Sequence, residues 1–165
     1  EGVMMSDDLD DEELYAKVSD RLIRLAATIV GPADAEDVMI DGVVSALNSR
    51  RWAVVDDRVS YLYRCVTNAG RMHLRSSARR RGREDRSSSL AERVGRPIGI
   101  PEPVHEVRSA VAGLSARQRA VLYLTYWEDL DERTTAQRLG ISVGSVRRHL
   151  DRARKNVEGK LHDSL

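Results

Sequence analysis

The chain has 165 residues, of which 41% are hydrophobic, 32% are charged and one is a cysteine, so it is long enough for one domain or two small ones. A single cysteine, Cys65, excludes an internal disulfide and favours a reducing compartment. No apolar run approaches the roughly 18 residues of a membrane span, and the acidic start lacks the positive region of a signal peptide. We therefore expect a cytoplasmic protein without membrane insertion.

The formal net charge of +1 hides a strong segregation of charge along the chain. Acidic residues crowd the first 13 positions, which we interpret as a separate, solvated acidic segment. These residues are Asp7, Asp8, Asp10, Asp11, Glu12 and Glu13. Arginines crowd the middle and the end of the chain, which favours a polyanionic partner.

Two amphipathic helices are predicted in the first 50 residues. Apolar residues recur at helical spacing from Leu14 to Ile29, and Gly31 with Pro32 should end that helix. A second helix should begin after Asp34 and run to about Ser49, with its acids in the first turns, where the helix dipole favours them. The apolar residues predicted to share one side of it are Val38, Val43, Val44 and Leu47.

A loop over residues 50–57 should separate these helices from a third, which begins near Val59 and is basic at its far end. Such a density of arginines suits a nucleic-acid backbone, although a solvated arginine tail is an alternative. The arginines are Arg64, Arg71, Arg75, Arg79, Arg80, Arg81, Arg83 and Arg86. The nearby aromatics, Trp52, Tyr61 and Tyr63, fit either a core position or stacking on an unpaired base.

Residues 84–103 contain serines, glycines and prolines without an apolar period, which is typical of a linker. Helical patterns resume over 104–112 and again after Ser115, which with Gln118 three residues later has the form of a capping box. We expect an all-α protein with two small helical domains joined by a flexible linker.

The last third of the chain, residues 130–155, has the pattern of a helix-turn-helix. Ala136 supplies the small residue of the first helix, Gly140 the turn, and Val146 the buried aliphatic of the second helix. Ser142 should cap that second helix, which then begins at about Val143. The helix is strongly basic and therefore predicts DNA binding, with a solvated basic helix as the alternative.

Four stretches together resemble a bacterial group IV sigma factor of the extracytoplasmic-function class. The stretches are ADAEDVMIDGVVSAL, YLYRCVTNAGRMHLRSSARRR, LSARQRAVLYLTYWEDL and GISVGSVRRHLDRARK. The resemblance spans about residues 14–161 and implies an acidic segment at 1–13, sigma region 2 at 14–83, a linker at 84–103 and sigma region 4 at 104–165.

The resemblance implies three partners, of which the first two are core RNA polymerase and promoter DNA. Polymerase would bind the acidic helix; the alternative is that its acids only complement the helix dipole. The residues assigned to polymerase are Glu36, Asp37, Asp41 and Val44. The third partner, an anti-sigma factor that holds the two domains, is also expected from the resemblance.

The resemblance also assigns two sets of DNA-contacting residues. The minus-10 set, which includes a loop that captures a flipped base, is Asp56, Ser60, Arg64, Asn68, Arg71, Arg75 and Arg79. The minus-35 set is Ser145, Arg147, Arg148, His149 and Arg152. Departures from the family pattern, among them Met72 where an acid is common, indicate a divergent member.

An enzyme is not indicated, because the chain has no Gly-rich phosphate loop and its four histidines are scattered. We expect no cofactor and no metal site. Two other functions stay open: a regulator that binds DNA without polymerase, and a sigma-like protein that sequesters polymerase or an anti-sigma factor. The first would not need the acidic helix, and the second would tolerate loss of the arginines.

Overall fold

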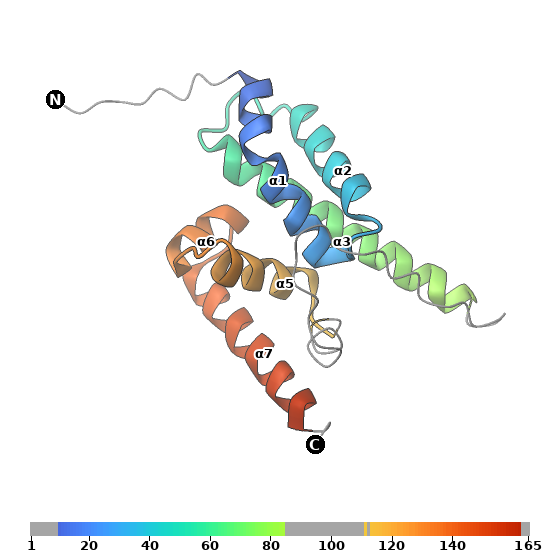
Figure 1. The fold of residues 1–165 in the computed structure, drawn as a ribbon. Coiled ribbons are helices and arrows are strands. Elements are labelled where there is room, and N and C mark those ends of the chain that lie inside the picture. Colours follow the sequence, from blue (N-terminus) through green and yellow to red (C-terminus); the bar gives the residue numbers. More distant parts are fainter. Residues whose placement is uncertain (1–9, 85–110, 112, 163–165) are drawn as a thin grey trace.

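The computed structural model describes residues 10–84, 111 and 113–162, and their regular structure is helical. Two groups of helices are visible in Figure 1, three in the first half of the chain and the others in the second half. The elements are α1 (Asp11–Val30), α2 (Ala35–Leu47), α3 (Arg58–Glu84), α5 (Ala116–Leu122), the π-helical turn η1 (Tyr123–Trp127), α6 (Glu132–Leu139) and α7 (Val143–His162). The all-α fold of two helical domains is confirmed. Nearly all of the helix predicted over 104–112, and nearly all of the linker, lie outside the described residues.

α1 forms as its apolar spacing predicts. Leu14, Leu22 and Ile29 are buried on one side of it, against α2 and α3. The helix ends at Gly31, whose φ of 90° is a conformation that side chains disfavour. This end turns the chain back so that α2 can pack beside α1 (Figure 1).

α2 differs from the prediction in which residues it buries. Val38 and Val43 face the core, but Val44 is 48% exposed and Leu47 is 44% exposed. The helical period places these last two residues on the outer side, while the inner side packs on α3. Gly42 allows that approach, since a β-carbon there would lie 2.6 Å from the Cα of Val66.

The last residues of the predicted acidic segment 1–13 belong to the first helix. Asp11 begins α1, and its carboxylate accepts a hydrogen bond of 3.0 Å from the Trp52 indole and one of 3.2 Å from Arg58. The Arg58 guanidinium also lies 5.2 Å from the centroid of the Trp52 ring. These contacts fix the loop before α3 against the start of α1. Residues 1–9 lie outside the described part.

The helix-turn-helix forms as predicted. Gly140 has φ 64° and ends α6, and the Ser142 hydroxyl accepts a hydrogen bond of 3.1 Å from the backbone N–H of Ser145 at the start of α7. Ala136 and Val146 are buried together with Val121 in a small apolar core. The capping box of Ser115 and Gln118 is also present, and α5 begins directly after that serine.

The two domains pack directly on each other. α5 contacts α1 and α3, and α6 contacts α3 (Figure 1). Ala120 and Leu124 of the second domain are fully buried in the same apolar cluster as Leu22 and Leu25 of the first. The larger hydrophobic core of the protein therefore extends through the domain interface.

Candidate functional site

The outer side of α2 is both acidic and apolar. Glu36, Asp37, Asp41 and Val44, the residues that the resemblance assigns to polymerase, are all exposed. Ile40, which is 44% exposed, lies between them. An apolar strip flanked by carboxylates fits a partner surface that combines an apolar patch with basic side chains.

The minus-10 residues near the start of α3 are unequally accessible. Asp56 is exposed, whereas Ser60 is fully buried and its hydroxyl donates a hydrogen bond of 2.6 Å to Asp57. The assignment of Ser60 to DNA contact therefore does not hold in this arrangement of the domains. Two predicted stacking residues are also buried, because Trp52 is 8% exposed and Tyr63 is 1% exposed.

The other minus-10 residues follow one another along α3. Arg64 and Arg71 are half-buried, and Asn68 between them is exposed. Arg75 and Arg79 are exposed. The end of α3 extends beyond the other helices in Figure 1. α3 therefore presents a row of donors, of which the first part lies next to the second domain.

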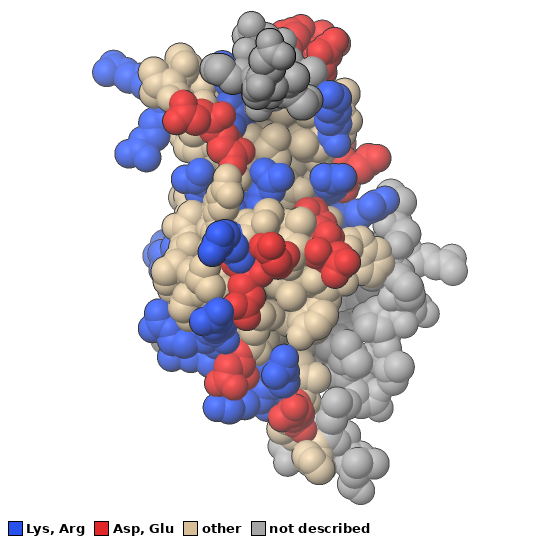
Figure 2. Space-filling model, turned by 90° about the vertical axis from the view of Figure 1, so that its left-hand side faces the viewer, with Lys and Arg blue, Asp and Glu red and all other residues tan. Residues whose placement is uncertain are grey.

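The minus-35 residues lie in the first half of α7. Arg147, Arg148 and Arg152 are exposed, and Ser145 and His149 are half-buried. In Figure 2, Lys and Arg side chains gather over the lower part of the molecule, where α7 lies. Arg147 is held by Glu132 of α6 through a hydrogen bond of 2.6 Å between Nε and Oε2.

α6 of the helix-turn-helix is attached to the start of α3 through polar contacts. Asp57 accepts a hydrogen bond of 2.9 Å from Gln137, and Arg138 donates one of 3.2 Å to the Ser60 hydroxyl. Burial raises the pKa of Asp57, but hydrogen bonds from Ser60 and Gln137 and the charge of Arg138 outweigh it and hold this pKa below its usual value. The ionised Asp57 thus joins the two domains.

A second polar contact is centred on Glu128, which follows η1. Its carboxylate accepts hydrogen bonds of 2.8 and 3.1 Å from the hydroxyl of Tyr63 on α3. Burial raises the pKa of Tyr63 above its ordinary value, and the neighbouring Glu128 charge adds to the effect. The Tyr123 hydroxyl donates to the carbonyl of Arg21 at 3.2 Å. Both tyrosines therefore hold the interface in their neutral forms.

The two domains also lie close together beside the turn of the helix-turn-helix. A β-carbon at Gly140 would lie 2.7 Å from Cδ of Arg64, so a larger residue here would push the Arg64 side chain aside. Arg119 of α5 donates a hydrogen bond to the carbonyl of Ile29 at the end of α1. The second domain thus covers the start of the candidate minus-10 surface, and we call this arrangement the closed form.

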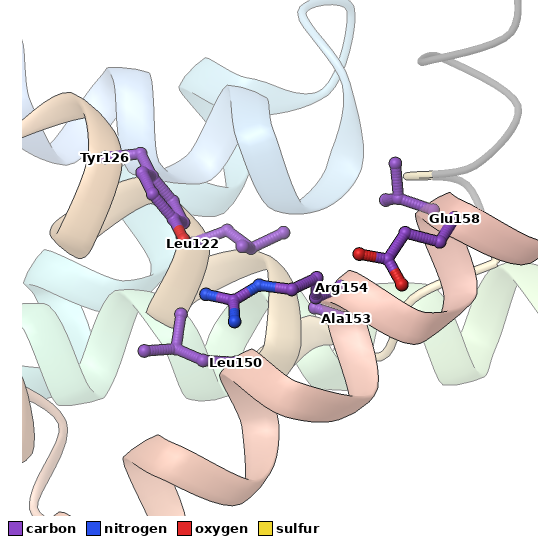
Figure 3. Close-up of a pocket in the computed structure, with 7 residues that line it drawn as sticks. Leu122, Tyr126, Leu150, Ala153, Arg154 and Glu158 are labelled. Atoms are coloured by element: carbon purple, nitrogen blue, oxygen red, sulfur yellow. The ribbon is translucent and has the colours of Figure 1, made fainter. Parts of the chain in front are cut away.

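An apolar groove of about 380 Å³ lies on the second domain, between α5 with η1 and α7. Figure 3 shows Tyr126, Leu122 and Leu150 on one part of it and Arg154 with Glu158 along α7. Tyr126 is 65% exposed, and Trp127 beside it is also exposed. Both aromatics belong to the π-helical turn η1, and such turns are frequent at functional sites.

Among the described residues, no cluster of three or more His, Cys, Asp or Glu side chains is arranged to hold a metal ion. None of the described helices is long and apolar enough to span a membrane.

Comparisons with known proteins identify the family. The family described as Sigma-70 region 2 matches residues 14–80, and Sigma-70 region 4 matches residues 105–157. The RNA polymerase sigma-E factor of Streptomyces coelicolor is 28% identical over 95% of this chain and 89% of its own length. The chain belongs to the sigma-70 superfamily, in its extracytoplasmic-function class. It is a promoter-specificity factor of transcription initiation, with core RNA polymerase and promoter DNA as its partners.

Other relatives agree with this assignment. The RNA polymerase sigma-E factor of Streptomyces avermitilis is 28% identical over 93% of this sigma factor and 86% of its own length. Two solved structures share the fold: the sigma factor RpoE of Bartonella quintana in complex with the anti-sigma factor NepR, and CnrH in complex with the cytosolic domain of CnrY. The first has a TM-score of 0.59, 21% identity and coverage of 92% of this chain and 96% of the other. CnrH has a TM-score of 0.57, 22% identity and coverage of 93% of this chain and 88% of the other.

Sequence reasoning did not identify the residues that close the sigma factor. Gln137, Arg138 and Glu128 make the interdomain contacts, but each occupies an ordinary polar position on or beside a helix. Ile40 and Leu47 were also missed as parts of the exposed face of α2. The spacing of Ile40, Val44 and Leu47 at i, i+4 and i+7 was the available signal.

Proposed function

We propose that this sigma factor acts as a non-catalytic, cytoplasmic subunit of the polymerase holoenzyme, with region 2 on the polymerase and minus-10 DNA and region 4 on minus-35 DNA. The observation that carries the proposal is the match of both regions, in family order, on a chain whose α2 face is exposed. A regulator that binds DNA alone would not need that acidic and apolar face.

Region 2 binds polymerase through the outer side of α2. The carboxylates of Glu36, Asp37 and Asp41 steer the encounter with a basic partner, and Ile40 with Val44 supplies the apolar contact. The alternative is that these acids only complement the unpaired N–H groups at the start of the helix, which would not require all three of them. Their continuation to Asp41, beyond the first turn, favours a binding role over complementing the dipole alone.

The closed form cannot read both promoter elements at once. Elements named minus-10 and minus-35 are about 25 base pairs apart, which is roughly 85 Å along a straight duplex at 3.4 Å per base pair. In the closed form, however, Arg64 of the minus-10 set contacts Gly140, three residues before α7. The domains must therefore separate when the holoenzyme binds a promoter.

The chain between α3 and Val111 is long enough for this separation. It has 26 residues, from 85 to 110, and 26 residues can span at most roughly 90 Å. Opening would also expose Ser60 and Tyr63, which α6 and Glu128 cover in the closed form. The assignment of Ser60 to DNA contact thus applies to the open form.

Region 4 offers a surface for a helix of a protein partner. The groove beside Tyr126, with Trp127 at the surface, has the apolar lining that an amphipathic helix requires (Figure 3). The polymerase flap is the first partner that we propose for it. An anti-sigma factor is a further partner, because the similar fold of RpoE was solved in complex with one.

The polymerase contact is tested by charge reversal on α2. Asp37→Lys and Asp41→Lys should each weaken binding to core polymerase by about tenfold or more, since each turns an attraction into a repulsion. Asp20→Lys on the exposed side of α1 is the matched control. Equal affinities for the three variants, measured by fluorescence anisotropy with labelled sigma factor, would contradict the proposal.

A further inference from the structure

The two domains enclose a basic cleft of about 260 Å³ that the sigma-factor function does not require. Arg64, Asn68 and Arg71 of α3 line one side of it, and Arg117 of α5 and Gly140 line the other. The three guanidinium groups come from both domains. The cleft therefore exists only in the closed form.

No carboxylate compensates this charge. None of the residues lining the cleft is acidic, and none of the salt bridges within the described residues involves Arg64, Arg71 or Arg117. The positive field extends toward α7, where burial, with Arg117 and two arginines of α7, holds the pKa of His149 below its ordinary value. Like charges gathered without a counter-charge repel one another, so an anion in the cleft would lower the free energy of closure.

A buried polar atom in the same cleft also lacks a partner. Thr67 lines the cleft, its residue is 8% exposed, and its hydroxyl oxygen has no hydrogen-bond partner. Buried hydroxyls are nearly always hydrogen-bonded, and an oxyanion would accept a bond from this one. Asn68 adds an amide donor at the exposed side.

We propose that the cleft binds a diphosphate group, free or as part of a nucleotide, and that this ligand holds the two domains together. Three arginines match the several oxygens and negative charges of a diphosphate better than those of a monoanion. The volume is below that of sites for drug-sized ligands, which fits a group of this size. The ligand would thus keep Arg64 and Arg71 from minus-10 DNA, and by linkage it would stabilise the closed form.

The test is titration calorimetry of the full chain, without polymerase or DNA, at constant ionic strength. The ligands are inorganic diphosphate, ADP, inorganic phosphate and sulfate. We expect diphosphate, ADP or both to bind with one site per chain and at least tenfold more tightly than sulfate. Binding of diphosphate alone would identify the free ion, and binding of ADP at equal strength would identify the group on a nucleotide.

Variants outside the DNA-contacting sets locate the site. Arg117→Ala should weaken diphosphate binding about tenfold and Thr67→Val severalfold, while Arg50→Ala, which removes an equal charge away from the cleft, should change it less than twofold. Circular dichroism checks that each variant is folded. Equal effects of Arg117→Ala and Arg50→Ala, or sulfate binding as tight as diphosphate, would overturn the proposal. Either result would leave the sigma-factor function untouched, because neither polymerase nor promoter is in the assay.

Discussion

The hydroxyl of Tyr63 on α3 donates a hydrogen bond of 2.8 Å to Glu128, 65 residues further along the chain. The bond joins region 2 to region 4, and Tyr63 is 1% exposed. Arg138 lies 5.5 Å from the centroid of the same ring. Both the ring and the hydroxyl of Tyr63 therefore contact the second domain in the closed form.

Removal of that hydroxyl should destabilise the closed form. Tyr63→Phe leaves the Glu128 carboxylate without this donor, and we expect a loss of about 1.5 to 3 kcal/mol in the free energy of unfolding, as for hydrogen bonds to charged groups. Tyr15→Phe on α1, which removes only a weak hydrogen bond of 3.7 Å to the sulfur of Met39, is the control. Urea denaturation measures both, and equal midpoints would show that the bond contributes nothing.

Charge reversal on α6 should open the molecule. Arg138→Glu places a carboxylate beside Asp57 and Ser60, so the contact with α3 becomes repulsive. The radius of gyration from small-angle X-ray scattering should increase. Arg133→Glu changes the same charge on the exposed side of α6 and should leave the radius unchanged. Equal radii of gyration for the two variants would argue that the contact between α6 and α3 does not hold the domains together.

Acidification should weaken region 4 through His149. Burial, then the charges of Arg117, Arg152 and Arg148, lowers the pKa of this imidazole in the folded state, so the unfolded chain binds the proton first. The contribution of His149 is present above pH 6.5 and is lost as pH falls through that value toward the folded pKa, with a slope of at most about 1.4 kcal/mol per pH unit.

Replacement of the imidazole tests this pH dependence. His149→Asn should reduce the fall in unfolding free energy between pH 7.5 and pH 5.5, whereas His162→Asn at the exposed end of α7 should not. Denaturant unfolding at the two pH values gives the comparison. If the free energy of unfolding of the His149 variant fell as much as that of the unchanged chain, other groups would be responsible for the pH dependence.

A further prediction concerns Arg148 on α7, the second helix of the helix-turn-helix. Arg148 is exposed, and its guanidinium donates a hydrogen bond of 3.2 Å to Ser145, which orients it at the start of α7. Arg148→Ala should weaken binding to a minus-35 duplex by about 1 to 3 kcal/mol and relax the preference at one base pair. Lys155→Ala should cause a smaller loss that is the same for all sequences. A loss of affinity without a change in base-pair preference would show that Arg148 contacts a phosphate and not a base.

Much of the fold could be predicted because local signals agree with it. The apolar spacing of α1, the cap at Ser115 and the turn at Gly140 each fix a helix or its end from nearby residues. The outer side of α2 was harder, since the exposed Val44 and Leu47 were predicted to share one side of the helix with Val38 and Val43, which are buried. In the sequence alone, an apolar residue that contacts a partner cannot be distinguished from one that is buried in the core.

The closed form could not be predicted from the sequence. It depends on contacts between residues 65 to 102 positions apart, such as Tyr63 with Glu128 and Arg21 with Tyr123, and helical periodicity carries no information on such pairs. The same limit applies to the basic cleft, because Arg64 and Arg117 become neighbours only when the domains pack. Burial of Ser60 follows from that packing and was missed for the same reason.

Run-off transcription tests the central claim most directly. The purified chain is added to bacterial core polymerase with fragments of the host genome, and the transcript starts are mapped by sequencing. A sigma factor that opens and reads both elements should give discrete starts that share motifs about 10 and 35 base pairs upstream. Binding to polymerase without discrete starts, or the same starts without the chain, would contradict the account.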